Sequence, residues 1–148
     1  NPVCLMIMDI DFFKPVNDTH GHDVGDDVIK EFASRIGMSI RGIDLACRYG
    51  GEEFVVVMPD TDLSMASTVA ERLRRQMADK SFAVSNKGLE LDLTCSIGVT
   101  VSQEQEEADS LLKRADEALY KAKRDGRNRV VVAPCPVTTF VKTGAAAR

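Results

Sequence analysis

Residues 45–58, which read Leu-Ala-Cys-Arg-Tyr-Gly-Gly-Glu-Glu-Phe-Val-Val-Val-Met, decide the fold of this chain. Two apolar runs flank a Gly-Gly pair, and this pattern predicts a β-hairpin with strands at residues 45–48 and 54–58. Gly50 and Gly51 would supply the positive φ that a two-residue turn needs, and their missing side chains would let a ligand approach the backbone. Glu52 and Glu53 place two carboxylates at the same turn.

A second pair of acids ends the apolar run at residues 3–10, which its length and β-branching predict to be a central strand buried on both faces. Asp9 and Asp11 lie on one side of this strand because side chains alternate with a period of two. If the hairpin is its neighbour, several carboxylates meet, and two like charges 4 Å apart cost about 4 kcal/mol at an effective dielectric near 20. A divalent cation such as Mg²⁺ would remove that cost. Each of these acids, taken alone, is better interpreted as a solvated turn residue. The two acids at the end of an apolar strand, together with the Gly-Gly-Glu-Glu turn, favour a metal site instead.

The remaining pattern predicts an α+β fold in which helices cover a sheet that is mainly antiparallel at its centre. After the first strand come a helical or turn segment at residues 12–18 and a helix that Asp23 caps and that reaches about residue 40. The elements expected after the hairpin are a helix capped by Asp62 or Ser64, strands at residues 82–84 and 89–101 joined at Asn86-Lys87-Gly88, a helix capped by Asp109 and stopped at Asp125-Gly126, and a strand at residues 130–132. Residues 1–133 form one domain, and residues 134–148 are expected to be a poorly ordered or vector-derived tail.

Composition narrows the class of protein. The 148 residues suit one domain, the net charge of −4 argues against broad nucleic-acid binding, and no apolar run reaches the roughly 20 residues that span a membrane. A small anionic ligand is still possible, because a local basic cluster can hold it. The chain has four cysteines and no Cys-x-x-Cys pair. We therefore expect Cys4, Cys47, Cys95 and Cys135 to be small buried hydrophobic residues in a reducing, cytoplasmic compartment rather than disulfide or metal-binding residues. The start at Asn1-Pro2, directly before a strand, predicts a domain of a longer protein.

Three ordered motifs carry a resemblance to a known family. They are Asp-Ile-Asp-Phe-Phe-Lys-Pro-Val-Asn-Asp at residues 9–18 with Gly-His-Asp-Val-Gly-Asp at 21–26, Arg-Tyr-Gly-Gly-Glu-Glu-Phe at 48–54, and Ala-Asp-Glu-Ala-Leu-Tyr-Lys-Ala-Lys at 115–123 with Gly-Arg-Asn at 126–128. Together they resemble the GGDEF family of diguanylate cyclases, in its GGEEF form, and in particular the cyclase domain of PleD-type response regulators. The resemblance covers roughly residues 3–132. His20 replaces a more usual aromatic, and the family's upstream Asp-x-Leu-Thr motif is absent from this sequence.

The resemblance implies a core like that of adenylyl cyclases and polymerase palm domains, with a ferredoxin-like arrangement. It also implies the condensation of two GTP into cyclic di-GMP, with Mg²⁺ or Mn²⁺ as cofactor at two ions per pair of half-sites. By position, Asp9, Glu52 and the Ile10 carbonyl would bind the metal, with Glu53 beside it. The residues implied to contact GTP are Phe12, Phe13 and Lys14 around the triphosphate, Asn17 and Asp26 at the guanine, Gly50 and Gly51 at the turn, and Lys123 and Arg127 at the β- and γ-phosphates.

Arg41 and Asp44 match a further feature of the family, an Arg-x-x-Asp site that binds cyclic di-GMP and inhibits the enzyme, with Arg72 as a secondary contact. Residues 45–49 separate this motif from Gly50, and as an extended strand they would span roughly 17–20 Å. The resemblance therefore implies allosteric inhibition. Because the product has two-fold symmetry, it also implies a homodimer of half-sites, which an upstream sensor or receiver domain would control.

Two other functions compete with the cyclase. A non-catalytic receptor could bind cyclic di-GMP through Arg41 and Asp44, but receptors usually lose the glycines or acids of the hairpin, which this sequence keeps. A palm-like nucleotide-binding domain with another substrate is disfavoured by Asn17 and Asp26. His20 and His22 could form a metal pair, although a role at the entry to a helix is the preferred interpretation.

Overall fold

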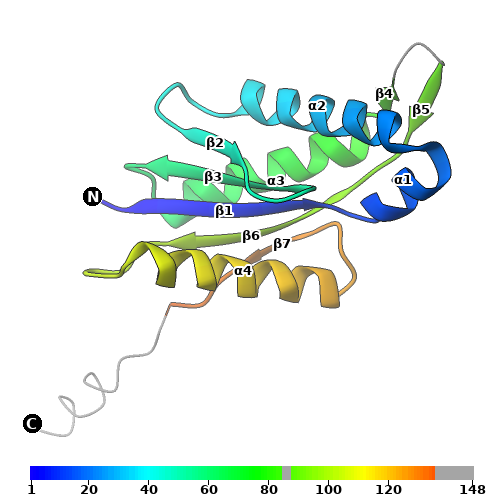
Figure 1. Cartoon of the computed structure of the whole chain (residues 1–148). Helices are drawn as coiled ribbons and strands as arrows, with labels where there is room; N and C mark the ends of the chain where they lie inside the picture. The colour runs from blue at the N-terminus through cyan, green and yellow to red at the C-terminus, as the bar shows by residue number, and fades with distance from the viewer. Residues whose placement is uncertain (85–87, 136–148) are drawn as a thin grey trace, which may run out of the picture.

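The computed structural model describes residues 1–84 and 88–135. Its elements, shown in Figure 1, are β1 (Val3–Ile10), α1 (Phe13–His20), α2 (His22–Ser39), β2 (Leu45–Arg48), β3 (Glu53–Pro59), α3 (Leu63–Asp79), β4 (Phe82–Val84), β5 (Leu89–Leu91), β6 (Cys95–Val101), α4 (Ala108–Arg124) and β7 (Val130–Val132). None of the helices among these residues is both long and apolar enough to cross a lipid bilayer.

The strands form a five-stranded sheet in the order β2-β3-β1-β6-β7, and β4 pairs with β5 in a separate two-stranded sheet. β1 is antiparallel to both β3 and β6, whereas β7 runs parallel to β6. The predicted α+β class, the mainly antiparallel centre and the central position of the first strand are confirmed. The hairpin is therefore the direct neighbour of the strand that carries Asp9.

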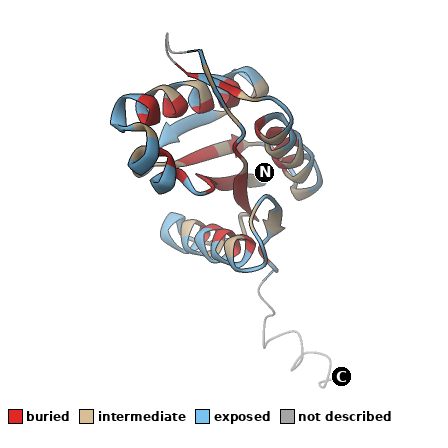
Figure 2. Ribbon diagram, turned by 90° about the vertical axis from the view of Figure 1, so that its right-hand side faces the viewer, coloured by how far each residue is buried: buried red, intermediate tan, exposed pale blue. Residues whose placement is uncertain are grey.

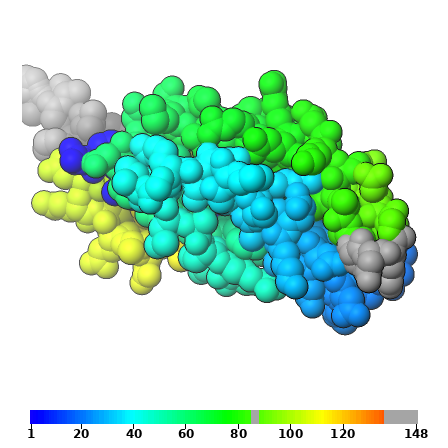
Figure 3. All heavy atoms as spheres, turned by 90° about the horizontal axis from the view of Figure 1, so that it is seen from above, coloured from blue at the N-terminus to red at the C-terminus, as the bar shows by residue number. Residues whose placement is uncertain are grey.

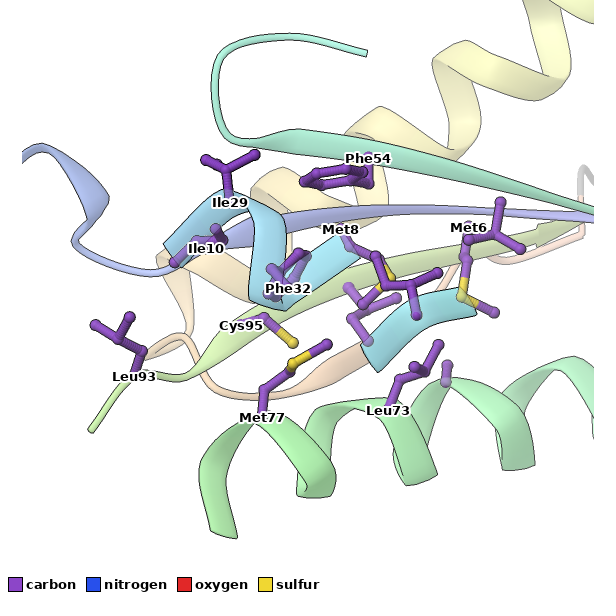
Figure 4. Close-up of a cluster of buried hydrophobic side chains, with 14 of the residues drawn as sticks. Met6, Met8, Ile10, Ile29, Phe32, Phe54, Leu73, Met77, Leu93 and Cys95 are labelled. Carbon is purple, nitrogen blue, oxygen red and sulfur yellow. The ribbon is translucent and has the colours of Figure 1, made fainter. Parts of the chain in front are cut away.

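Each face of the sheet packs against helices, and the alternation along β1 assigns its side chains to them. Met6, Met8 and Ile10 point into the larger core under α2 and α3, where they meet Phe32 and Leu73 (Figure 4). Leu5 and Ile7 point to the opposite face and pack against the apolar side of α4, which contributes Leu111, Ala115 and Leu119. Figure 2 shows the buried positions concentrated where the sheet meets the helices.

The contact between β6 and α4 is unusually close at Gly98. A Cβ atom at this position would meet the backbone of Ala115 and Leu119, so only glycine lets the helix lie this near the strand. Since Lys123 is in the last turn of α4, this close approach also fixes how far the lysine stands from the end of β1.

Four details of the predicted elements are wrong. Asp23 and Asp109 are not N-caps: α2 and α4 begin at His22 and Ala108, so both acids lie in a first helical turn, where their charge still favours the helix. Residues 89–101 are not one strand, because β5 pairs with β4 while β6 pairs with β1. The segment between them changes sheets, which periodicity along a single strand cannot reveal.

The burial of the cysteines is the fourth error: Cys4 and Cys95 are buried as expected, but Cys47 and Cys135 are exposed. All four residues of β2 are exposed, since this strand forms the edge of the sheet. The predicted cap at Asp62 is confirmed by the bond that its side chain accepts from the Met65 N–H, 2.8 Å away. The predicted turn residues Asn86 and Lys87, and residues 136–148 of the predicted tail, lie outside the described residues.

Candidate functional site

The acids of the hairpin meet those of β1 because the two strands are paired in register, with Asp9 directly opposite Glu53. Their side chains share the face of the sheet that α4 covers. Asp9 is buried, and Glu52 and Glu53 are half-buried. Like charges opposite each other in a sheet are unfavourable. Lys123 of α4 forms an ion pair with Asp9 and offsets part of this repulsion.

The electrostatics of this cluster favour a bound cation. Burial raises the pKa of Asp9, and hydrogen bonding to Lys123 only partly opposes that rise. Burial and the neighbouring Asp9 charge raise the pKa of both Glu52 and Glu53. In addition, Oδ1 of Asp9 is buried without a hydrogen-bond partner among the described residues. An unpartnered carboxylate oxygen beside two further acids is the arrangement that a divalent cation would satisfy.

A cavity of about 230 Å³ opens between the end of β1, the start of α1 and the end of α4; Asp9 and Glu52 line it, whereas Glu53 does not. Eight of the ten residues that line it are ones for which the resemblance implied contact with metal or triphosphate. They are Asp9, Ile10, Phe12, Phe13, Lys14, Glu52, Lys123 and Arg127, and the two others are Asp11 and Pro15. The sequence predicted most of this lining from residues far apart in the chain.

The start of α1 gives the cavity the character of an anion site. Phe12 has a left-handed backbone, with φ 56°, and so turns the chain from β1 directly into the helix. The first N–H groups of a helix have no partner within it, and they attract phosphate together with the helix dipole. The guanidinium of Arg127 lies 4.7 Å from the centre of the Phe12 ring. Backbone amides, Lys123 and Arg127 therefore offer several donors to one anionic ligand.

Asn17 and Asp26, the residues implied to bind guanine, lie at the α1–α2 corner and do not line this cavity. The Oδ1 atom of Asn17 is buried and has no partner among the described residues. It rests against Gly25, where a Cβ atom would collide with it. Asp26 follows at once and is exposed. A free amide oxygen and a free carboxylate suit the N–H groups of a guanine edge.

The glycines of the hairpin act differently from the prediction. Positive φ occurs at Gly21, Gly88 and Gly126 among the glycines of the described residues, and so not at Gly50 or Gly51. The loop between β2 and β3 spans four residues, and the Tyr49 and Gly50 N–H groups both donate to the Glu53 carbonyl, at 2.7 and 3.2 Å. The longer loop needs no left-handed residue. A Cβ at Gly50 would nevertheless lie only 3.0 Å from Oε1 of Glu53.

Arg41 and Asp44 face each other at the start of β2. Two nitrogens of the Arg41 side chain donate to the carboxylate of Asp44, at 3.1 and 2.8 Å, and Arg41 also contacts Thr61. Arg72 of α3 donates to the carbonyl of Ser39, two residues before Arg41, at 2.8 Å. The three predicted residues of the product site are thus gathered at one end of α2.

A larger hollow of about 920 Å³ runs between α2 and α3, whose side-by-side position Figure 3 shows from above. Arg72 lines it, as do Ser64, Ser67 and Thr68, but neither Arg41 nor Asp44 does. None of the residues implied to bind metal or GTP lines it, so the smaller cavity is the candidate active site despite its size.

The protein side chains alone do not form a complete metal site. Within residues 1–84 and 88–135 no three His, Cys, Asp or Glu side chains are grouped closely enough to hold an ion, and the possible metal pair His20 and His22 has no third partner. Mg²⁺ is commonly held by one or two carboxylates together with substrate phosphates. Asp9, Glu52 and the Ile10 carbonyl fit that pattern, in which the nucleotide completes the coordination.

Comparisons with known proteins identify the family of this chain. A family model described as diguanylate cyclase, GGDEF domain, matches residues 1–129. The chain is 52% identical over 132 residues to the response regulator PleD of Caulobacter vibrioides, covering 88% of this chain and 29% of PleD. It is 46% identical over 129 residues to diguanylate cyclase A of Treponema denticola, covering 86% of this chain and 34% of that protein. The chain therefore spans about a third of these curated relatives.

Solved structures of GGDEF domains are also similar to this chain. The GGDEF domain of DgcB from Caulobacter crescentus in complex with c-di-GMP matches with a TM-score of 0.87 and 38% identity, over 91% of this chain and 77% of that one. The active GGEEF domain of a diguanylate cyclase from Vibrio cholerae matches with a TM-score of 0.81 and 32% identity, over 92% and 85% of the two chains. The chain belongs to the GGDEF-domain family of diguanylate cyclases.

Proposed function

We propose that this chain is a diguanylate cyclase, which condenses two GTP into cyclic di-GMP and two pyrophosphates. The observation that carries the proposal is the single cavity in which Asp9 and Glu52 meet the start of α1, Lys123 and Arg127. Carboxylates that can hold a cation and donors that can hold an anion lie within one small space, where Asp9 and Lys123 pair with each other. A metal-bound nucleoside triphosphate supplies both charges in one ligand.

The residues then take distinct roles. Lys123, Arg127 and the free N–H groups at the start of α1 would hold the triphosphate, while Asn17 and Asp26 would accept from the N–H groups of guanine, which adenine lacks in that pattern. Asp9, Glu52 and the Ile10 carbonyl would hold a divalent ion, with Glu53 beside it. When bound, Mg²⁺ or Mn²⁺ would activate the attacking hydroxyl and neutralise the leaving pyrophosphate.

The reaction requires two copies of this site. The 3′-hydroxyl of each GTP gives up its proton to water, its oxygen attacks the α-phosphorus of the other GTP, the bond from that phosphorus to its bridging oxygen breaks, and pyrophosphate leaves with the bonding electrons. Because the product joins two GTP and the cavity beside Asp9 would hold one of them, we propose a homodimer in which two half-sites face each other. Control by a sensor or receiver domain, and a cytoplasmic location, belong to the same proposal.

The test of this function is the fate of the nucleotide. With Mg²⁺ present, GTP should be converted to a cyclic dinucleotide and ATP should not, and the rate per chain should rise with protein concentration because dimers form. The alternative, a receptor that only binds cyclic di-GMP, predicts binding of that nucleotide with no consumption of GTP.

A first prediction concerns feedback through Arg41. Arg41→Ala should raise the concentration of cyclic di-GMP needed for half-inhibition by at least about tenfold, because it removes a charged, fork-shaped donor for phosphate or guanine. Lys113→Ala, which removes an exposed cation from α4, is the control and should leave inhibition unchanged. Inhibition assays at a fixed GTP concentration measure both, and equal inhibition in wild type and Arg41→Ala would contradict the assignment.

A second prediction concerns pH. The raised pKa values of Asp9, Glu52 and Glu53 mean that the folded chain holds protons above the ordinary carboxyl pKa of about 4. A metal must displace those protons, so the Mn²⁺ concentration needed for half-maximal GTP binding should fall as pH rises above the ordinary carboxyl pKa of about 4. The stability of the metal-free chain should change in the opposite direction. Its free energy of unfolding should decrease over the same range, because the unfolded state binds fewer protons than the folded state. A nucleotide-binding titration at each pH tests the first effect, and pH-independent metal requirements would contradict it.

A further inference from the structure

Asp11 is a buried carboxylate that lines the cavity but has no part in the roles described above. The residue is only 4% exposed. Three donors reach it: the Thr94 hydroxyl at 2.6 Å, the Ser96 hydroxyl at 2.7 Å and the backbone N–H of Asn128 at 3.0 Å. Both of its oxygens therefore already accept hydrogen bonds, in contrast to Asp9, whose Oδ1 has no partner among the described residues. This difference argues against Asp11 as a second metal ligand.

The bond to Asn128 joins Asp11 to the turn that follows α4. The helix ends at Arg124 with Asp125 as its C-cap, and the Arg127 N–H donates back to the Ala122 carbonyl at 2.9 Å, as in a Schellman motif. Gly126, Arg127 and Asn128 all have positive φ, at 126°, 63° and 46°. Asparagine tolerates this region, so the strain of roughly 1–2 kcal/mol falls on Arg127. Contacts from outside the turn must hold this residue there.

Two such contacts converge on Asn128. Asp11 accepts from its backbone N–H, and Arg74 of α3 donates to its side-chain oxygen at 2.8 Å. Arg127 directly precedes Asn128, and its guanidinium lies over the Phe12 ring; both Arg127 and Phe12 line the cavity. Asp11 and Phe12 are adjacent, so the same corner of β1 holds the backbone of the turn and supports the arginine side chain.

We propose that Asp11 is a positioning residue that holds Arg127 in place for the β- and γ-phosphates of the nucleotide. It acts through the Asn128 N–H and does not itself touch the metal or the substrate. The proposal rests on the proposed function in that the ligand is a nucleoside triphosphate. Asp11 would therefore set the preference for a triphosphate over a monophosphate.

The test is a double-mutant cycle read by equilibrium binding in Mg²⁺. The ligands are GMP and a GTP analogue with a methylene bridge between the α- and β-phosphorus atoms. Asp11→Ala should weaken binding of the analogue about tenfold, should leave GMP binding unchanged, and should have no further effect in an Arg127→Ala background. Asp11→Asn should restore most of the affinity, because one amide oxygen can still accept from Asn128 and Thr94 while the amide nitrogen donates to Ser96. Asp11→Leu replaces the alanine variant if that variant fails to fold.

Each contrary outcome is distinct. If Asp11→Asn is as damaging as Asp11→Ala, the carboxylate charge matters and the positioning role is wrong. If GMP binding falls as much as analogue binding, or if Asp11→Ala still weakens binding in the Arg127→Ala background, Asp11 does not act through Arg127. If the wild-type chain binds the analogue and Arg127→Ala weakens it while Asp11→Ala does not, only this inference fails. If the wild-type chain binds no analogue, the proposed function is wrong, and this inference is wrong with it.

Discussion

Glu52→Gln is expected to lower cyclic di-GMP formation at least about 1000-fold, while the folded structure is retained. Glu52 lines the cavity beside Asp9, where its carboxylate would hold the metal that stabilises the leaving pyrophosphate. A glutamine has the same shape but no charge, so it cannot replace the carboxylate as a ligand. Rates of pyrophosphate release and product formation measure the loss.

The same variant carries a prediction about stability that separates a metal role from a structural one. Burial and the charge of Asp9 raise the pKa of Glu52, which means that its ionised form is disfavoured in the folded chain. The melting temperature of Glu52→Gln at neutral pH should therefore equal or exceed that of the wild type. Glu117→Gln, at an exposed position of α4, is the matched control and should leave activity unchanged. Full activity in Glu52→Gln would disprove the metal assignment.

Gly98→Ala should destabilise the fold by about 2 kcal/mol or more, although it adds a single methyl group. The added Cβ would meet backbone atoms of Ala115 and Leu119, which cannot rotate away as a flexible side chain could. α4 would have to move off the sheet and would carry Lys123 away from Asp9. Weaker GTP binding should therefore accompany the lower free energy of unfolding.

Gly37→Ala is the matched control for that change. Gly37 lies on the exposed side of α2, and a Cβ there has no atom within 4 Å. The same substitution should stabilise the chain by about 0.5–1 kcal/mol, because alanine loses less backbone entropy in a helix. Urea denaturation of the two variants should thus give opposite signs. Equal effects would show that the contact between β6 and α4 is not the cause.

The sequence predicted the centre of the site well because alternation and apolar length constrain it. An apolar run of residues 3–10 had to be a central strand, and its pairing with the hairpin brings Asp9 opposite Glu53. The residues at the start of α1 follow Asp9 immediately, so their place in the cavity follows from the chain path. The family motifs then predicted Lys123 and Arg127, which no local pattern would connect with β1.

Other features depend on contacts that no local pattern contains. The partners of Asp11 lie 83, 85 and 117 residues further along the chain, so its role as an acceptor could not be inferred from its neighbours. The only indication in the sequence that Asp11 belongs to the site was its position on the same face as Asp9. Cys47 was misplaced because alternation cannot tell an edge strand from a covered one. The φ values of Gly50 and Gly51 were misjudged because loop length, which sets the need for left-handed residues, was taken as two residues.

The central claim is that two copies of this cavity condense two GTP. The most direct measurement is mass-spectrometric identification of the products when the chain is incubated with GTP and Mg²⁺, both alone and fused at its N-terminus to a dimeric coiled coil. The fused dimer should convert GTP to cyclic di-GMP and pyrophosphate in a ratio of about one to two, as the in-line displacement of two pyrophosphates requires, and Glu52→Gln in the same fusion should not. A fused dimer that binds GTP but forms no cyclic di-GMP would contradict the claim.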